Sequence, residues 1–125
     1  MTKNSHHCFK LLCGAAIILA AGCSSLKTPA TANVAVSNAA LENASNSGGT
    51  EFAPLEMATA REKMALANKA MAAKDYKLAM DLSNQAQADA KLAQSKARST
   101  KAQIAADALQ DDIRVLREEL DRANR

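Results

Sequence analysis

The spacing of apolar and polar residues changes several times along the chain, and each change predicts a different segment. Residues 11–21 (LLCGAAIILAA) are apolar throughout, whereas residues 24–50 show no sustained period. From residue 51 onwards, apolar residues recur at steps of three and four, which is the pattern of an amphipathic helix. The pattern therefore predicts an all-α protein whose folded part covers residues 51–125.

The first periodic stretch predicts a helix over about residues 52–72. Its apolar face consists of Met57, Ala60, Met64, Ala67 and Met71. Pro54 suits the first helical turn, where its missing N–H leaves no hydrogen bond unmade. Asp75 is a good N-cap for a second helix, so we expect a tight turn before it. A continuous helix through Lys74 is the alternative, because the break contains neither glycine nor proline.

The second helix is predicted from Tyr76 to about Arg122, a stretch without glycine or proline. The apolar face of its first half is lined mostly by small residues, namely Ala79, Leu82, Ala86, Ala90, Ala93 and Ala97. In its second half, a coiled-coil pattern of larger residues follows at Leu109, Ile113, Leu116 and Leu120. The first helix is too short to cover these four residues. We therefore expect an antiparallel helical hairpin whose long second helix offers its coiled-coil-like half to a partner.

Residues 23–50 are predicted to be a flexible tether before the hairpin. Serine, threonine, asparagine and alanine dominate this segment, Gly48 and Gly49 stand near its end, and it has almost no charge. Such a composition is typical of linkers. A short helix over residues 34–43 is the alternative, although it would be marginal in isolation.

The N-terminus has the three parts of a secretory signal peptide. Lys3 and Lys10 supply a basic head, and small residues precede Cys23. The apolar middle is about half as long as the ~20 residues of a bilayer-spanning helix. The stretch AAGC at 20–23 resembles the lipobox of bacterial lipoproteins, with Ala20 where leucine is usual. The resemblance implies that residues 1–22 are removed and that the Cys23 thiol is acylated. An uncleaved membrane segment is the alternative.

By the same resemblance, Ser24 implies sorting to the outer membrane of a Gram-negative cell, with the protein facing the periplasm. Two or three acyl chains on Cys23 would make the anchor effectively permanent, since one chain alone binds only weakly. Cys8 and Cys13 lie in the predicted leader. No disulfide is therefore expected within the mature chain.

Composition and charge narrow the functional classes. Aromatic residues make up only 2% of the chain, and much of the 48% apolar fraction is alanine. Such a chain favours long helices packed side by side over a thick core. Without Lys3 and Lys10, 14 basic residues stand against 13 acidic ones, so no electrostatic attraction to nucleic acid is expected.

No catalytic constellation is evident after Cys23. That part of the sequence has no histidine, no base spaced to activate a serine, and no phosphate loop, zinc spacing or calcium loop. We therefore expect no enzyme activity, no cofactor and no metal site. A mildly basic stretch contains Lys91, Lys96, Arg98 and Lys101. It is interpreted either as a solvated helix face or as a contact for an anionic polymer such as peptidoglycan.

The helical part contains the pieces AP at 53–54, AR at 60–61, DYKLA at 75–79 and DAKLA ending at Ala93. On these pieces it resembles the bacterial domain-of-unknown-function family 4398 over about residues 52–121. Members look like short lipoproteins or precede an OmpA-like peptidoglycan-binding domain. The family therefore implies an envelope address and a helical architecture, but no activity.

The expected function is that of a structural or adaptor lipoprotein without catalytic activity. Its lipid would hold it to the outer membrane, and its long helix would bind a second copy or another envelope protein. A noncovalent, peptidoglycan-associated tether similar to the small murein lipoproteins is the alternative. Their covalent linkage through a C-terminal lysine is not expected, because this sequence ends in DRANR. A helix lying on the membrane is disfavoured by the alanine-rich face and the acidic residues near the C-terminus.

Overall fold

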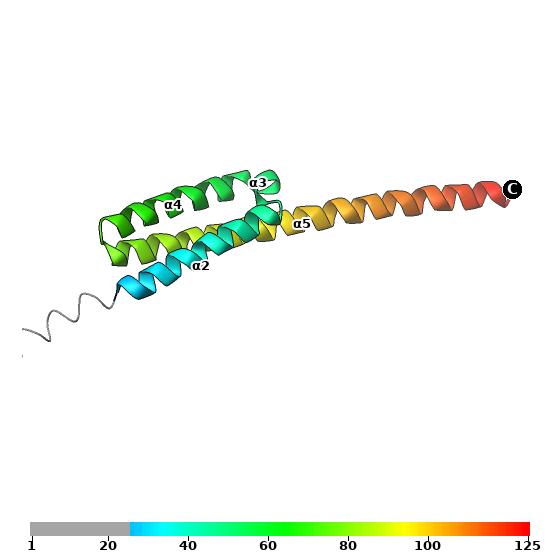
Figure 1. The fold of residues 1–125 in the computed structure, drawn as a ribbon. Coiled ribbons are helices and arrows are strands. Elements are labelled where there is room, and N and C mark those ends of the chain that lie inside the picture. Colours follow the sequence, from blue (N-terminus) through cyan, green and yellow to red (C-terminus); the bar gives the residue numbers. More distant parts are fainter. Residues whose placement is uncertain (1–25) are drawn as a thin grey trace, which may run out of the picture.

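A computed structural model describes residues 26–125, which fold into helices and their connections without any strand (Figure 1). The helices are α2 (Lys27–Asn46), α3 (Gly49–Phe52), α4 (Pro54–Ala72) and α5 (Tyr76–Ala123). The predicted leader at 1–22 and the predicted lipid site at Cys23 lie outside the described residues. For the described part, the predicted all-α class is confirmed.

Three of the helices form a bundle in which the chain runs up, down and up again (Figure 1). α4 and α5 are joined by the turn at 73–75 and lie antiparallel, which confirms the predicted hairpin with its long second helix. α2 packs against both of them and runs in the same direction as α5. α5 is roughly 72 Å long at ~1.5 Å per residue. Its second half therefore extends beyond the bundle as a single helix.

The prediction of a tether over 23–50 is wrong for residues 27–46, because these residues form α2. The inner face of α2 consists of buried Ala30, Ser37 and Ala44 together with half-buried Val34 and Leu41. These positions follow steps of four and three, but most of them are small, so their composition resembles a linker. Contacts with α4 and α5 supply the stability that an isolated helix of this composition lacks. The shorter helix considered as an alternative lies within α2.

Gly48 and Gly49 form the tight connection from α2 to α3 rather than the end of a tether. Gly48 has a φ of +92°, in the left-handed region that favours glycine. A Cβ atom on Gly49 would lie 2.7 Å from the carbonyl oxygen of Ala44. From α5, Gln94 Nε2 donates a hydrogen bond to Ser47 Oγ at 3.2 Å and so ties this connection to the bundle.

The turn between α4 and α5 has a defined geometry although it lacks glycine. Lys74 has a φ of +62°, and the backbone N–H of Asp75 donates to the carbonyl oxygen of Ala70 at 2.9 Å. These features make a Schellman motif, which ends α4. The Asp75 side chain accepts a hydrogen bond from the backbone N–H of Leu78 at 3.1 Å, so the predicted N-cap is confirmed. Pro54 begins α4, also as predicted.

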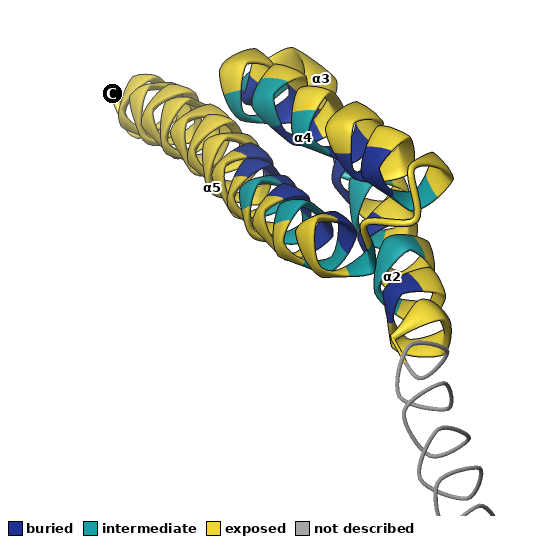
Figure 2. Ribbon diagram, turned by 90° about the vertical axis from the view of Figure 1, so that its left-hand side faces the viewer, coloured by how far each residue is buried: buried dark blue, intermediate teal, exposed yellow. Residues whose placement is uncertain are grey.

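The core of the bundle is built almost entirely from alanine. Its buried apolar residues are Ala30, Ala44, Ala53, Met57, Ala60, Met64, Ala67, Ala70, Ala79, Ala86, Ala90, Ala93 and Ala97. Because these side chains are short, the helix backbones approach closely. Ser37 Oγ of α2 lies 2.8 Å from the carbonyl oxygen of Ser83 on α5, to which it donates. Figure 2 shows the buried faces of the helices turned towards one another.

The two predicted apolar faces are confirmed with small adjustments. On α4, four of the five predicted residues are buried, and Met71 is half-buried. On α5, Leu82 was predicted to be part of the buried face. The structure buries the next residue, Ser83, instead, and Leu82 is half-buried. A large side chain at the centre of that face would hold α2 away from α5. Ser83 instead allows the close approach.

Candidate functional site

The surroundings of α5 change after Ala97. Up to that residue, α5 contributes buried side chains to the bundle, but every residue from Arg98 to Arg125 is exposed. Lys101 still contacts the bundle, since its Nζ lies 5.6 Å from the centre of the Phe52 ring. We call residues 98–123 the free half of α5. It lies in the longest run of exposed residues in the described part of the chain.

Six large apolar side chains are exposed on the free half, and four of them lie at heptad spacing while Ile104 and Val115 lie outside that spacing. Leu109, Ile113, Leu116 and Leu120 are 62, 47, 58 and 63% exposed, and we call these four residues the seam. Burying such a side chain is worth roughly 1.5–3 kcal/mol, so leaving four of them in water favours association. The length of the predicted first helix indicated that it would not reach these residues, and the structure places no described helix against them.

The seam follows a heptad repeat abcdefg with apolar residues at a and d. Ile113 and Leu120 occupy position a, and Leu109 and Leu116 occupy position d. The same register places three exposed alanines at a or d, namely Ala102, Ala106 and Ala123. Sequence reasoning missed these alanines because it considered only large residues. With them, the stripe extends over roughly three heptads.

The seam does not continue the face by which α5 packs in the bundle. At ~100° per residue, its mean direction lies about 130° around the helix from the buried stripe that ends at Ala97. Figure 2 shows α2 and α4 on one side of α5, with the other side exposed. A second helix could therefore lie along the seam without meeting α2 or α4.

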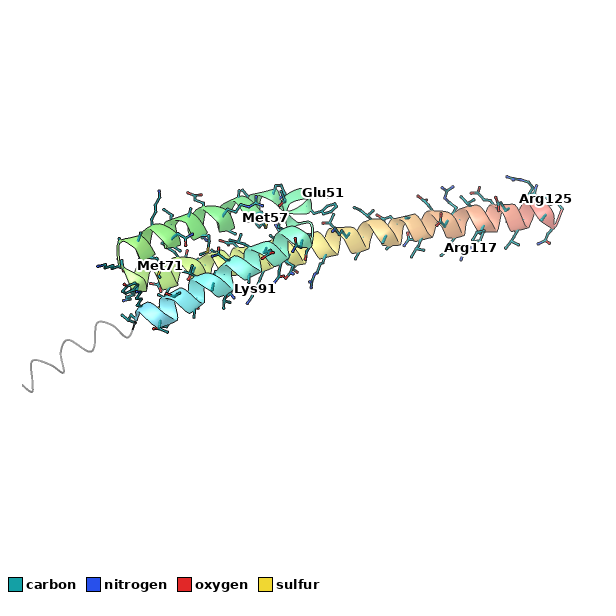
Figure 3. All side chains as sticks on the ribbon, viewed as in Figure 1. Glu51, Met57, Met71, Lys91, Arg117 and Arg125 are labelled. Carbon is teal, nitrogen blue, oxygen red and sulfur yellow. The ribbon has the colours of Figure 1, made fainter. Side chains whose placement is uncertain are left out.

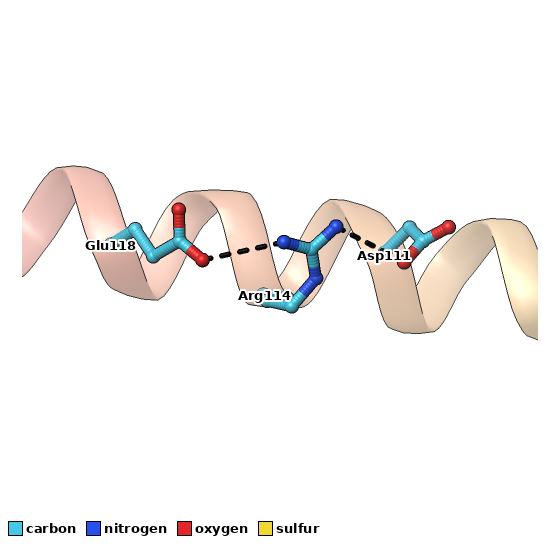
Figure 4. Close-up of polar contacts among 3 residues, drawn as sticks. All are labelled: Asp111, Arg114 and Glu118. Carbon is cyan, nitrogen blue, oxygen red and sulfur yellow. Dashed lines mark hydrogen bonds and ion pairs between the residues drawn. The ribbon is translucent and has the colours of Figure 1, made fainter.

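The ion pairs of the free half lie off the seam. Arg114 is 3.4 Å from both Asp111 and Glu118 (Figure 4). The three residues occupy heptad positions b and f, on the outer face of a coiled coil. Such pairs stabilise a helix by roughly 0.2–0.5 kcal/mol each. They support the free half locally and leave the seam uncovered, and side chains project into solvent along its whole length (Figure 3).

The basic stretch is partly engaged by the bundle. Lys96 forms an ion pair with Glu56 of α4, and this hydrogen bond lowers the pKa of Glu56 below its usual value of 4.5. Lys101 lies over the aromatic ring described above. Lys91 and Arg98 are exposed, and neither forms an ion pair with a described residue. Only these two cations of the stretch are unengaged, which makes it a weaker surface for an anionic polymer than four would be.

Residues 26–125 were also searched for metal-binding clusters, pockets and membrane-spanning helices. This part of the chain has no cluster of three or more His, Cys, Asp or Glu residues placed to hold a metal ion. An open groove of about 500 Å³ is lined by Leu66, Lys69, Ala70, Ala73, Asp75, Leu78 and Leu82. Its one carboxylate is already the N-cap of α5. Over the same residues, none of the helices has both the length and the apolar content to cross a membrane.

A family profile matches residues 32–109, and its family is described as a domain of unknown function, DUF4398. The chain belongs to the DUF4398 family. The resemblance predicted from residues 52–121 is thereby confirmed, and the matched DUF4398 segment begins earlier, inside α2. No curated protein and no solved structure matches the chain significantly. Leu109 is the last matched residue, so the other three seam residues follow the matched segment.

The sequence pieces that resemble DUF4398 have structural roles in the bundle. Asp75 of DYKLA caps α5, and Ala79 of the same piece is fully buried. Asp89 of DAKLA forms an ion pair at 2.7 Å with Lys63 of α4. Arg61 donates a hydrogen bond at 3.1 Å to a threonine of α3. These residues fix the positions of the helices, so the pieces that carry the resemblance help to hold the bundle together.

Proposed function

We propose that this protein is a structural or adaptor lipoprotein, anchored in the bacterial outer membrane and facing the periplasm, without catalytic activity. A lipid on Cys23 would hold the chain at the membrane, and the seam would bind a helix of a partner. The observation that favours the adaptor role most is the row of four large apolar side chains exposed on the free half of α5.

The arrangement of the helices separates the proposed anchor from the seam. α2 begins at Lys27, four residues after Cys23, and its first turn lies at the same end of the bundle as the α4–α5 turn (Figure 1). The C-terminus of α5 is at the opposite end of the molecule. The seam would stand roughly 50–65 Å along α5 from the membrane-proximal end. In this proposal, a stiff helical spacer gives the reach that the sequence had assigned to a flexible tether.

The anchor is tested by mass spectrometry of the full-length chain produced in a Gram-negative cell. We expect the purified membrane form to begin at Cys23 with its thiol and amino group acylated, and to fractionate with the outer membrane. Cys23→Ser should abolish acylation and outer-membrane recovery, whereas Cys13→Ser should change neither. An intact leader, or an unmodified thiol at residue 23, would contradict the anchor.

The adaptor role is tested by cross-linking in intact cells. We expect the full-length protein to form a discrete covalent adduct that Leu116→Lys removes, because a charge on the seam is costly to bury against a helix. Ile104→Lys is the matched control, since Ile104 is also exposed on α5 but lies at heptad position f. The adaptor role is wrong if Leu116→Lys leaves the same adducts as the unaltered chain.

A noncovalent contact with peptidoglycan is the second candidate, and exposed Lys91 and Arg98 favour it. The purified full chain would be sedimented with isolated sacculi at low and high salt. Binding that salt weakens, and that the double substitution Lys91→Gln with Arg98→Gln reduces, would support the contact, because exposed charge pairs are screened by salt. If the chain remains in the supernatant after the sacculi have been pelleted, the contact is excluded.

A further inference from the structure

We propose that the partner of the seam is a second copy of this chain, and that the two α5 helices form a parallel two-stranded coiled coil over residues 102–123. The inference deepens the adaptor role of the proposed function and rests on it, while it does not depend on the lipid. Two observations support the inference. The heptad stripe is uncovered, and charges of opposite sign flank it at the positions that face a partner in a parallel pair.

The centre of the seam favours two strands, although the other a residue of the seam, Leu120, is not β-branched. A β-branched residue at a with leucine at d is the combination that parallel dimers prefer. Ile113 at a is followed by Leu116 at d, and Leu109 precedes them at d. At the ends of the stripe, Ala102 and Ala123 allow the two helices to approach closely.

The charges beside the seam select the partner and its direction. Asp112 occupies position g and Arg117 position e of the next heptad. In a parallel pair, position g of one helix faces position e of the following heptad on the other, so Asp112 of each copy would meet Arg117 of its partner. This contact would occur twice by symmetry. Neither residue has an ion pair within the described part of one chain.

An antiparallel pair is disfavoured by the same residues. When the two seams (residues 109–120) overlap fully in opposite directions, position g faces position g, and Asp112 would meet Glu119 of the other copy. Like charges at these positions oppose pairing. Sequence reasoning had identified the seam but not this orientation, because Asp112 and Arg117 show their roles only after every position of the free half has been placed in the heptad register.

The bundles do not obstruct the parallel arrangement. The seam points about 130° away from the stripe that α2 and α4 cover, so the two bundles would lie on the outer sides of the paired α5 helices. A parallel pair also places the starts of both α2 helices at the same end (Figure 1). Two lipids attached close before α2 could enter one membrane.

The orientation is tested with engineered cysteines in the full-length chain, in which Cys8 and Cys13 are replaced by serine and Cys23 is kept. Ala102→Cys and Ala123→Cys, made separately, are each expected to give disulfide-linked dimers in the periplasm. Glu118→Cys at the outward f position, and the parent chain without an added cysteine, are expected to give no disulfide-linked dimer. If neither Ala102→Cys nor Ala123→Cys cross-links above the parent chain, the parallel dimer is wrong.

The charge assignment is tested by mixing two single variants of the full chain, purified in detergent. Arg117→Glu and Asp112→Lys should each weaken the homodimer roughly tenfold, because both symmetric contacts become repulsive. Mixed together, they should form a heterodimer as tight as the original, since the acid of one then meets the base of the other at both contacts. Arg114→Glu and Asp111→Lys, which make the same charge changes at b and f, should neither weaken dimers nor rescue one another.

The mixing experiment distinguishes this inference from the broader proposal. Rescue in the mixture supports the parallel dimer even if Cys23 is found unmodified. The inference is wrong if all four variants have the same dissociation constant and no mixture restores the dimer. It is also wrong if the seam cross-links only to a different protein. In that last case the adaptor role survives. Sedimentation equilibrium in detergent measures the dissociation constants, and circular dichroism confirms that each variant is helical.

Discussion

The two halves of α5 share one helix but are stabilised in different ways. Before Ala97 the helix presents alanines to two neighbouring helices, and backbone proximity leaves no space for a larger side chain. After Ala97 it presents leucines, isoleucines and a valine to water, and apart from Lys101 over the Phe52 ring, the side-chain contacts of this half are between its own residues. In this chain, small residues line the interfaces within the bundle, whereas a row of large residues at heptad spacing lies on the half of α5 that no described helix covers.

The sharpest test of this contrast places the same substitution in each half. Ala90→Leu puts three extra carbon atoms into a fully buried position and should destabilise the bundle by about 3 kcal/mol. Ala106→Leu adds the same atoms at an exposed position of the stripe and should leave the bundle intact. Thermal unfolding followed by circular dichroism measures both. Equal losses of stability would show that the two halves are not distinct.

The connection between α2 and α3 should be the next most sensitive point of the bundle. Gly49→Ala is expected to cost about 2 kcal/mol, because its Cβ would meet a backbone oxygen at 2.7 Å, which cannot move freely. Gly48→Asn should cost less, since asparagine tolerates a left-handed φ and the nearest neighbour is the flexible end of Lys101. Denaturant unfolding curves of the two variants should therefore differ in midpoint, and the reverse order would contradict the described connection.

The cap of α5 belongs to the bundle half and has a smaller effect. Asp75→Ala should destabilise the protein by about 1 kcal/mol, because the backbone N–H of Leu78 loses its acceptor. Asp75→Asn retains a side-chain oxygen and should keep most of the stability. If both variants unfold at the same temperature as the original chain, the cap has no energetic role.

In the free half, the largest single polar contribution should be smaller still. Arg114→Ala removes both local ion pairs and should cost roughly 0.5 kcal/mol, because exposed pairs along a helix are weak. The effect should appear as faster amide hydrogen exchange around residues 111–118, with no change in the bundle. Arg98→Ala, at an exposed position without an ion pair, is the control. Slower exchange in the bundle than in the free half is expected for both.

The smallest effect should come from the pH dependence of the bundle. The hydrogen bond from Lys96 lowers the folded-state pKa of Glu56, so the pair stabilises the fold above the usual carboxyl pKa of 4.5. That stabilisation is lost as the pH falls through the lowered pKa. Glu56→Gln should therefore lose less thermal stability than the original chain between neutral and acid pH. Identical pH profiles would show that this pair does not contribute.

The degree to which the sequence anticipated the fold follows from the size of the side chains involved. The apolar face of α4 contains three methionines, so its period was plain. α2 was mistaken for a linker because its inner face has only Val34 and Leu41 as larger residues, at positions that become meaningful once α4 and α5 are beside them. The seam was found for the opposite reason, since four large residues at heptad spacing are conspicuous in an alanine-rich chain.

By itself, the sequence determined the helical class, the N-cap at Asp75, the start of α4 at Pro54 and the positions of the seam, because each depends on local geometry or on a period along one helix. Only the tertiary structure decided that residues 27–46 join the bundle, that Gly48 and Gly49 make a turn, and that α2 and α4 lie on the side of α5 away from the seam. The physical reason is that alanine and serine have little preference for burial of their own. A face made of them becomes a core only when other backbones come close enough to cover it.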